Sequence, residues 1–326
     1  MASFLQDIRF GLRLLRRQPT FTAIALVVLT IGIGVNTAAF SVVNTLLLKP
    51  RVGGVDDQLV GIYSRDRNRP DDYRAFTWQE VERLAAHPQL FRTLAGHTFG
   101  LVGLAEGDAT RRVFADIVTA SYFDAFGVAP ILGRGFTREE AQPGADVPVT
   151  VISHGLYQRM GGTPGVVGRT IAINTRAFTI VGVAPSGFGG SLAMVTPELW
   201  VPTGVYESMT FDQRNEGVAP RLSDANVRAL IVVARLADGM TLDALGPGLE
   251  SLSRELAAAD PAGNKEHEVT AARLSRLSVG TRPQDDDELL GVVALLLSLG
   301  GMVLLIASFN LANMLLARAR ARSKEL

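Results

Sequence analysis

Two long stretches without a charged residue constrain this chain more than any other feature. They run from Phe21 to Leu48 and from Leu289 to Ala317 of the 326 residues. About 20 apolar residues in a helix already cross the hydrocarbon core of a bilayer, so each stretch is long enough to span it with some tilt. The sequence therefore predicts transmembrane helices at residues 21–48 and 289–317, with one large domain at residues 50–284 between them.

A cleaved signal peptide is the alternative for the first stretch. Its apolar part would be about 7–15 residues long and would end at a small-residue cleavage site. This stretch is longer, and it ends in Leu46, Leu47, Leu48, Lys49 and Pro50. A transmembrane helix is therefore the better interpretation.

Basic residues flank both predicted spans on the sides that face the chain ends. Four arginines precede the first span and four basic residues follow the second, namely Arg9, Arg13, Arg16, Arg17, Arg318, Arg320, Arg322 and Lys324. The second span is entered from an acidic run at residues 285–288, where the helix dipole favours negative charge. The positive-inside rule then places both termini in the cytoplasm and the large domain outside.

Residues 1–18 have a pattern of their own. Apolar residues recur there at helical spacing, at Phe4, Leu5, Ile8, Leu12 and Leu15, and the four arginines lie largely away from them. This pattern predicts an amphipathic helix on the cytoplasmic face, with arginine side chains at the lipid phosphates. A basic flank without a defined helix is the alternative. Residues 318–326 are predicted to be a cytoplasmic end.

Small and polar residues lie inside both predicted spans. The candidates for helix packing are Gly32, Gly34, Asn36, Ala38, Asn310 and Asn313. Small residues four apart let helix backbones approach closely, and polar side chains in hydrocarbon usually face other helices. Two interpretations are open: an interface that moves during a transport cycle, or static packing. Either one predicts contacts with more helices than these two.

Between the spans the pattern is that of a mixed α/β domain. Strands are predicted at residues 59–64, 111–118, 147–153, 227–236 and 269–274, helices at 78–86 and 242–258, and a hairpin at 169–174 with 177–183. The first and last parts each read as strand–helix–strand. Together they predict one split βαβ, ferredoxin-like sheet, and residues 91–222 are expected to be an insertion with its own small β-rich core. The fold class is thus an α+β domain on two transmembrane helices.

No motif for catalysis or cofactor binding is present. The chain has no cysteine, no GxxxxGK[ST] loop and no HExxH, and its four histidines have no metal-ligand spacing. A formal net charge of zero argues against a nucleic-acid binder. We therefore predict no catalytic, cofactor-binding or metal-binding residue, and expect the chain not to be an enzyme.

Several segments resemble one family in the same order along the chain. LQDIRFGLRLLR at 5–16 and LTIGIGVNTAAFSVVN at 29–44 resemble the start of MacB-type (FtsX-like) ABC transporter permeases. SYFDAFGV at 121–128, GRGF at 133–136, VGRT at 167–170, IVGVAP at 180–185 and LWVP at 199–202 resemble the periplasmic core domain of that family, and NLANMLLAR at 310–318 resembles the start of its permease module.

The resemblance implies a permease subunit in the bacterial inner membrane. A separate cytoplasmic ABC ATPase would bind ATP and drive the helices, which would move the periplasmic domain. This is mechanotransmission. The implied partners are that ATPase, membrane lipid, a second permease copy or repeat, and a periplasmic partner. A scaffold or regulator of FtsX type, acting on a periplasmic partner without transport, is the alternative.

The resemblance also implies parts that this sequence does not contain. Family members carry two more membrane helices and a short helix that docks the ATPase, where this sequence reaches Leu326. We therefore expect a fragment, a truncated product or one piece of a split system. A two-span sensor and a membrane-anchored enzyme are further alternatives, but the sequence offers neither an output module nor a catalytic set. The substrate and oligomeric state are left open.

Overall fold

The computed structural model describes residues 19–43, 58–107, 109–191, 196–210, 220–275, 280–284 and 286–322. The chain divides into two compact units, which are considered separately below. One unit holds the two ends of the chain with the long helices, and the other is Pro50–Asp285. The predicted helix at residues 1–18, with Arg9, Arg13, Arg16 and Arg17, lies outside the described residues.

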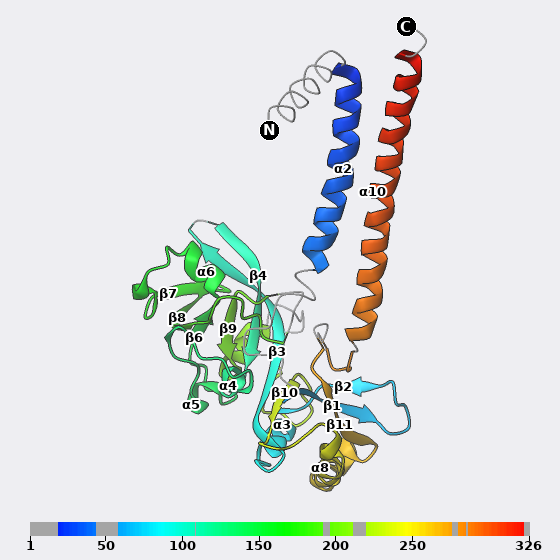
Figure 1. Cartoon of the computed structure of the whole chain (residues 1–326). Helices are drawn as coiled ribbons and strands as arrows, with labels where there is room; N and C mark the ends of the chain where they lie inside the picture. The colour runs from blue at the N-terminus through cyan, green and yellow to red at the C-terminus, as the bar shows by residue number, and fades with distance from the viewer. Residues whose placement is uncertain are drawn as a thin grey trace. The chain divides into compact units, whose positions relative to one another are not determined.

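The first unit consists of two long helices, drawn blue and red in Figure 1: α2 (Pro19–Val43) and α10 (Asp286–Arg322). Helix α10 has 37 residues and extends beyond the predicted 289–317 at both ends. It begins in the acidic run and ends among arginines, and both charge signs are favoured there by the helix dipole. Among the described residues, one helical segment is long and apolar enough to cross a membrane, Gly291–Asn310. The first predicted span and the two-span topology stay predictions.

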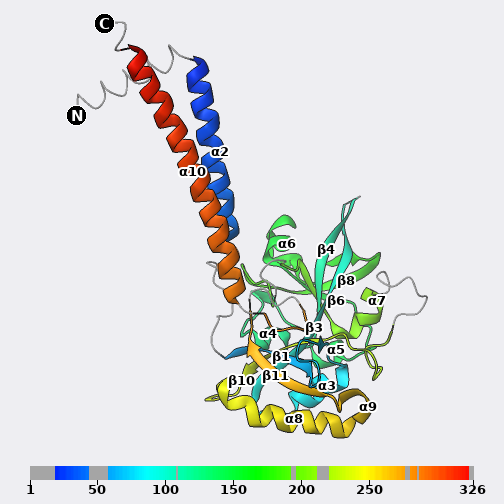
Figure 2. The ribbon, with the colours of Figure 1, turned by 90° about the vertical axis from the view of Figure 1, so that its right-hand side faces the viewer.

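The second unit contains the predicted split βαβ sheet. Its elements are β1 (Leu59–Asp66), α3 (Trp78–Ala85), β3 (Phe91–Glu106), β10 (Ile231–Leu236), α8 (Gly246–Ala259) and β11 (His267–Arg273). The strand order is β11-β1-β10-β3, and every neighbouring pair is antiparallel. Helices α3 and α8 contact each other, with α3 against β3 and α8 against β11 (Figure 2). This order is that of the ferredoxin-like fold.

Local sequence explains both helices. Thr77 and Glu80 form a capping box at the start of α3, since the Thr77 hydroxyl accepts from the Glu80 N–H and Glu80 accepts from the Thr77 N–H. Helix α8 buries Leu249, Leu252 and Leu256, which recur at helical spacing. It begins later than the predicted Leu242, because residues 243–245 form a 3₁₀ turn and Pro247 occupies the first helical turn.

Residues 109–210 form an inserted half. Its strands are β4 (Ala109–Val118), β5 (Leu132–Gly133), β6 (Val149–Ile152), β7 (Thr170–Ile173), β8 (Arg176–Val183) and β9 (Leu199–Pro202). Its helices are the short α4 (Tyr122–Ala125), α5 (Arg138–Ala141), α6 (His154–Arg159) and α7 (Tyr206–Thr210). Strands β7 and β8 form the predicted antiparallel hairpin. Two further short elements, β2 (Tyr73–Arg74) and α9 (Pro261–Asn264), belong to the ferredoxin-like half.

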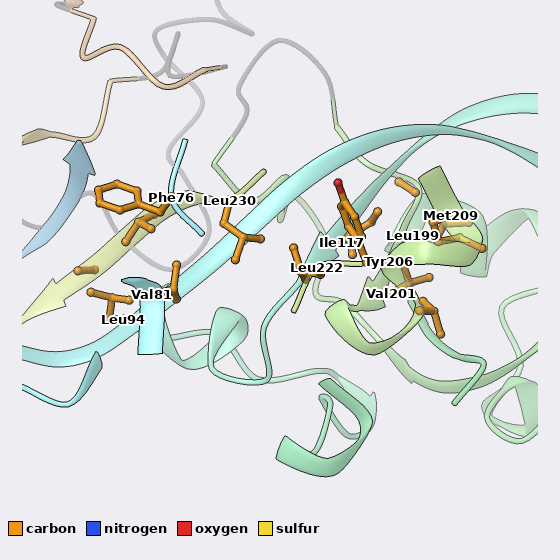
Figure 3. Close-up of a cluster of buried hydrophobic side chains, with 14 of the residues drawn as sticks. Phe76, Val81, Leu94, Ile117, Leu199, Val201, Tyr206, Met209, Leu222 and Leu230 are labelled. Atoms are coloured by element: carbon orange, nitrogen blue, oxygen red, sulfur yellow. The ribbon is translucent and has the colours of Figure 1, made fainter. Parts of the chain in front are cut away.

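The insertion has a hydrophobic cluster of its own, around Tyr122, Phe123 and Trp200, but this cluster is not separate from the rest of the domain, because it also includes Leu59 and Val233 of the ferredoxin-like half. Strand β3 has 16 residues, and it pairs with β10 in its first part and with β4 in the rest, so one sheet continues through both halves. The main hydrophobic cluster also continues. Figure 3 shows it running from Phe76, Val81 and Leu230 to Ile117 and Tyr206. The two halves therefore share one sheet, and each of the two hydrophobic clusters draws residues from both halves.

Candidate functional site

The first candidate site is the contact between α2 and α10. The Asn36 side-chain amide donates one hydrogen bond to the Gly300 carbonyl of α10 and another to the Gly32 carbonyl in its own helix, both at 2.9 Å. An amide NH₂ has two hydrogens, so this one group can make both bonds. Asn36 therefore links the two helices through a backbone carbonyl.

Two buried glycines allow the close approach. A Cβ atom on Gly300 would lie 2.7 Å from Asn36 Oδ1, which is too close for a relaxed contact. A Cβ on Gly32 would lie 3.6 Å from the Ala307 Cβ and from Leu304 Cδ1, which is ordinary packing distance. Small residues at helix contacts are typical of membrane helices, where van der Waals packing contributes much of the association energy. The sequence predicted Gly32 and Asn36 here but missed Gly300 as their partner.

The remaining predicted packing residues lie outside this contact. Gly34, Ala38, Asn310 and Asn313 are exposed in the helix pair, and a Cβ on Gly34 would meet no atom within 4 Å. Arg318, Arg320 and Arg322 lie in the last turns of α10. Large apolar side chains such as Leu26, Ile31 and Leu305 are also exposed on the two helices. These faces are suited to lipid or to further helices.

The second unit holds a buried polar pair that the sequence did not reveal. His97 Nδ1 of β3 lies 3.0 Å from Asp116 Oδ1 of β4, and both side chains are fully buried. The Tyr122 ring packs beside His97, and the Ser191 N–H donates to the Tyr122 hydroxyl at 3.3 Å. Burial raises the pKa of Tyr122, and the Asp116 carboxylate raises it further. The pairing of β3 with β4 brings these residues together, so their spacing along the chain cannot reveal the His97–Asp116 pair.

A cluster of charged side chains joins Glu80 of α3 to Arg228 and Arg74. Arg228 donates to both oxygens of the Glu80 carboxylate at 2.7 and 2.8 Å, and Arg74 lies 3.6 Å from the same group. Burial, together with the repulsion of Arg228, lowers the pKa of Arg74 to about 10. Each charge has an opposite partner, so the cluster has the character of a structural ion-pair network.

The buried His97–Asp116 pair and the ion pairs of Glu80 have the character of structural contacts. In the described parts of the chain, no group of three or more His, Cys, Asp or Glu side chains could hold a metal ion. His87 and His154 contact residues of their own helical segments or α8, and His267 begins β11. The absence of catalytic and cofactor sites stays a prediction.

Comparison with known proteins gives the class of this protein. Two relatives named "Macrolide export ATP-binding/permease protein MacB" are each 30% identical, over 116 residues in Chlorobaculum tepidum and over 123 residues in Chlorobium phaeobacteroides. Each match covers 35% of this chain but only 18% and 17% of the relatives, so the matched region is under a fifth of their length.

The family follows from a longer match. The model of the MacB-like periplasmic core domain family matches residues 22–252. The chain belongs to this family, and it therefore carries the periplasmic core domain of a MacB-type ABC permease.

Solved structures of similar domains were also found. The periplasmic region of MacB from Actinobacillus actinomycetemcomitans is 14% identical with a TM-score of 0.46, covering 73% of this chain and 92% of that one. A domain of a permease protein from Porphyromonas gingivalis is 18% identical with a TM-score of 0.47, covering 72% of this chain and 96% of that one.

Proposed function

We propose that this chain is a permease subunit, or part of one, of an ABC-type transporter or efflux system in the bacterial inner membrane. A separate cytoplasmic ABC ATPase binds and hydrolyses ATP, and the apolar helices transmit its motion to the periplasmic domain. The chain itself contributes no catalytic residue and no cofactor. One observation carries the proposal: the family match begins within α2 and continues through the domain to residue 252.

The helix contact supports a role in transmitting motion. Asn36 joins α2 to the Gly300 carbonyl of α10 by one hydrogen bond, a link that a modest change in helix position can break and remake. Interhelical hydrogen bonds of this kind contribute only about 0.6 kcal/mol on average. The exposed apolar faces of both helices are available to lipid, a second permease copy or further helices.

The first substrates to test are macrolides, because both curated relatives are named for macrolide export. The chain is coexpressed with an ABC ATPase from the same genome, and the two are reconstituted in nanodiscs. We expect copurification and a change in ATPase turnover when the chain is present. Asn36→Leu should weaken that change, whereas Asn310→Leu, at an exposed position outside the helix contact, should not.

The outcome separates transport from regulation. An ATPase that neither copurifies nor changes its turnover contradicts the proposal. If turnover changes, macrolide movement in sealed vesicles supports transport. A changed turnover without movement of any tested compound, together with a protein crosslinked to the periplasmic domain, supports instead a regulator of FtsX type.

A further inference from the structure

An open cleft of about 660 Å³ lies between the two halves of the periplasmic domain. Helix α3 of the ferredoxin-like half forms one wall, α4 and α5 of the inserted half form the other, and residues 92–94 of β3 lie between them. Binding sites for ligands are usually about 300–1,000 Å³. An occupant of this cleft would contact both halves at once.

The floor of the cleft is apolar and has room for a side chain. Leu94 and Phe136 are buried beneath it, Trp78 is half-buried, and the walls carry small residues such as Ala85 and Ala120. Two hydroxyls near the floor already have partners: the Ser121 hydroxyl donates to the Leu94 carbonyl at 2.7 Å, and the Thr119 hydroxyl accepts from the Gly96 N–H at 3.1 Å. Apolar contact and the charges of the rim are therefore the main features that an occupant would meet.

The rim carries charges that this chain does not pair. Glu82, Asp124 and Arg138 are exposed and make no side-chain hydrogen bond or ion pair with the described part of the chain. Arg92 is already bonded to Asp238 at 3.4 Å. The charge of Arg138 acts on the neighbouring Glu139 carboxylate. The carboxylates of Glu82 and Asp124 are thus the rim charges without a partner in the described part of the chain, which favours an occupant with positive charge. Because the rim is exposed, the occupant can continue beyond the cleft, as a segment of a protein chain does.

We propose that this cleft binds a segment of a partner protein outside the membrane. An apolar side chain of that segment packs on Trp78, and flanking lysine or arginine residues pair with Glu82 and Asp124. This inference deepens the proposed function, because it gives the periplasmic domain a surface for its partner. It rests on that function only for the location of the domain.

Tryptophan fluorescence tests the proposal directly. The chain has two tryptophans, and Trp200 is fully buried, so Trp78 reports on the cleft. The full chain in phosphatidylcholine nanodiscs is titrated with the blocked peptide Lys-Leu-Phe-Lys-Leu-Lys and with a twin that has glutamate in place of lysine. We expect a saturable change in emission with the basic peptide and binding about tenfold weaker with the acidic twin. Empty nanodiscs correct for binding to lipid.

Matched variants locate the binding. The double variant Glu82→Gln, Asp124→Asn keeps the side-chain shapes and should weaken binding of the basic peptide about tenfold. Ala85→Phe should block the cleft, whereas Ala258→Phe, at an equally exposed alanine of α8, should leave binding unchanged. Far-UV circular dichroism establishes that each variant is folded.

Three results would overturn the proposal: equal binding of both peptides, unchanged binding in the double variant, or binding of the small cation tetraphenylphosphonium with the same variant dependence but no binding of the peptides. The last result would assign the cleft to small molecules. The titration needs no ATPase. Its failure therefore leaves the proposed permease function standing, and loss of ATPase coupling leaves the cleft assignment standing.

Discussion

At the scale of single residues, the α2–α10 contact depends on the absence of a side chain at position 300. We predict that Gly300→Ala weakens the helix pair, because its Cβ would lie 2.7 Å from Asn36 Oδ1 and displace the hydrogen-bonding amide. The loss should be on the order of 1 kcal/mol, close to the value of one interhelical hydrogen bond. Titration with sodium dodecyl sulfate, followed by circular dichroism, measures it.

The neighbouring glycine provides the control. A Cβ on Gly301 would meet nothing within 4 Å, so Gly301→Ala should not weaken the helix pair. An equal loss in both variants would contradict the Asn36 contact as the cause, because the higher helix propensity of alanine would by itself give a gain.

A second residue-scale prediction concerns the turn between β7 and β8. Asn174 and Thr175 both have positive φ, 48° and 68°, and a β-branched residue is strained in that conformation. Thr175→Gly should stabilise the domain by about 1 kcal/mol, because glycine adopts positive φ freely and Asn-Gly is a favoured hairpin turn. Thermal unfolding measures the gain. Thr170→Gly, within β7, should lower the melting temperature instead, and a gain at both positions would argue against turn strain as the cause.

At the scale of elements, a half-buried ion-pair network joins β4 to α6 through Glu198. The Glu198 carboxylate accepts from Arg111 of β4 at 2.5 and 2.6 Å and also from Arg159 of α6. The hydrogen bond from Arg111 is the main cause that lowers the pKa of Glu198 below its usual 4.5, and the charge of Arg159 contributes too. The network therefore stabilises the fold only while Glu198 is ionised.

The pH dependence follows from the sign of that shift. A pKa lowered in the folded state gives stability that is complete above the unfolded value of 4.5 and is lost as the pH falls through the folded value. We predict that Glu198→Gln costs on the order of 1 kcal/mol at neutral pH and that its difference from the unmodified chain narrows below about pH 4.5. Melting curves across this range test it, with Glu250→Gln on α8 as the control. A constant difference at all pH values would rule out the ionised network as the source.

Elements with strong local patterns were predictable, and those that depend on tertiary pairing were not. The amphipathic pattern of residues 78–86 predicted α3, and alternation around a short turn predicted the β7–β8 hairpin. Strand β3 was missed because Gly96, Gly100 and Gly103 interrupt its apolar pattern. The His97–Asp116 pair and the cleft were missed for a related reason: their residues meet only through strand register and the packing of the two halves.

At the scale of the whole molecule, the predicted topology places residues 50–284 outside and both termini inside. The chain has no cysteine, so a single introduced cysteine reports its own location. A membrane-impermeant maleimide should label Ala177→Cys, which is exposed on β8, in intact spheroplasts. It should label Arg320→Cys only after permeabilisation, as the positive-inside rule requires. Labelling of both positions in intact spheroplasts would contradict the topology.

The length of β3 has a mechanical consequence for such a molecule. A strand rises about 3.3 Å per residue, so β3 extends about 50 Å without interruption through both halves of the domain. Tension along the strand axis would load the backbone hydrogen bonds to β10 and β4 in shear, so many of them must break at the same time. A pull perpendicular to the strand would break them one after another. The domain should therefore be stiff along β3, and a small tilt of one end should become a larger displacement at the other.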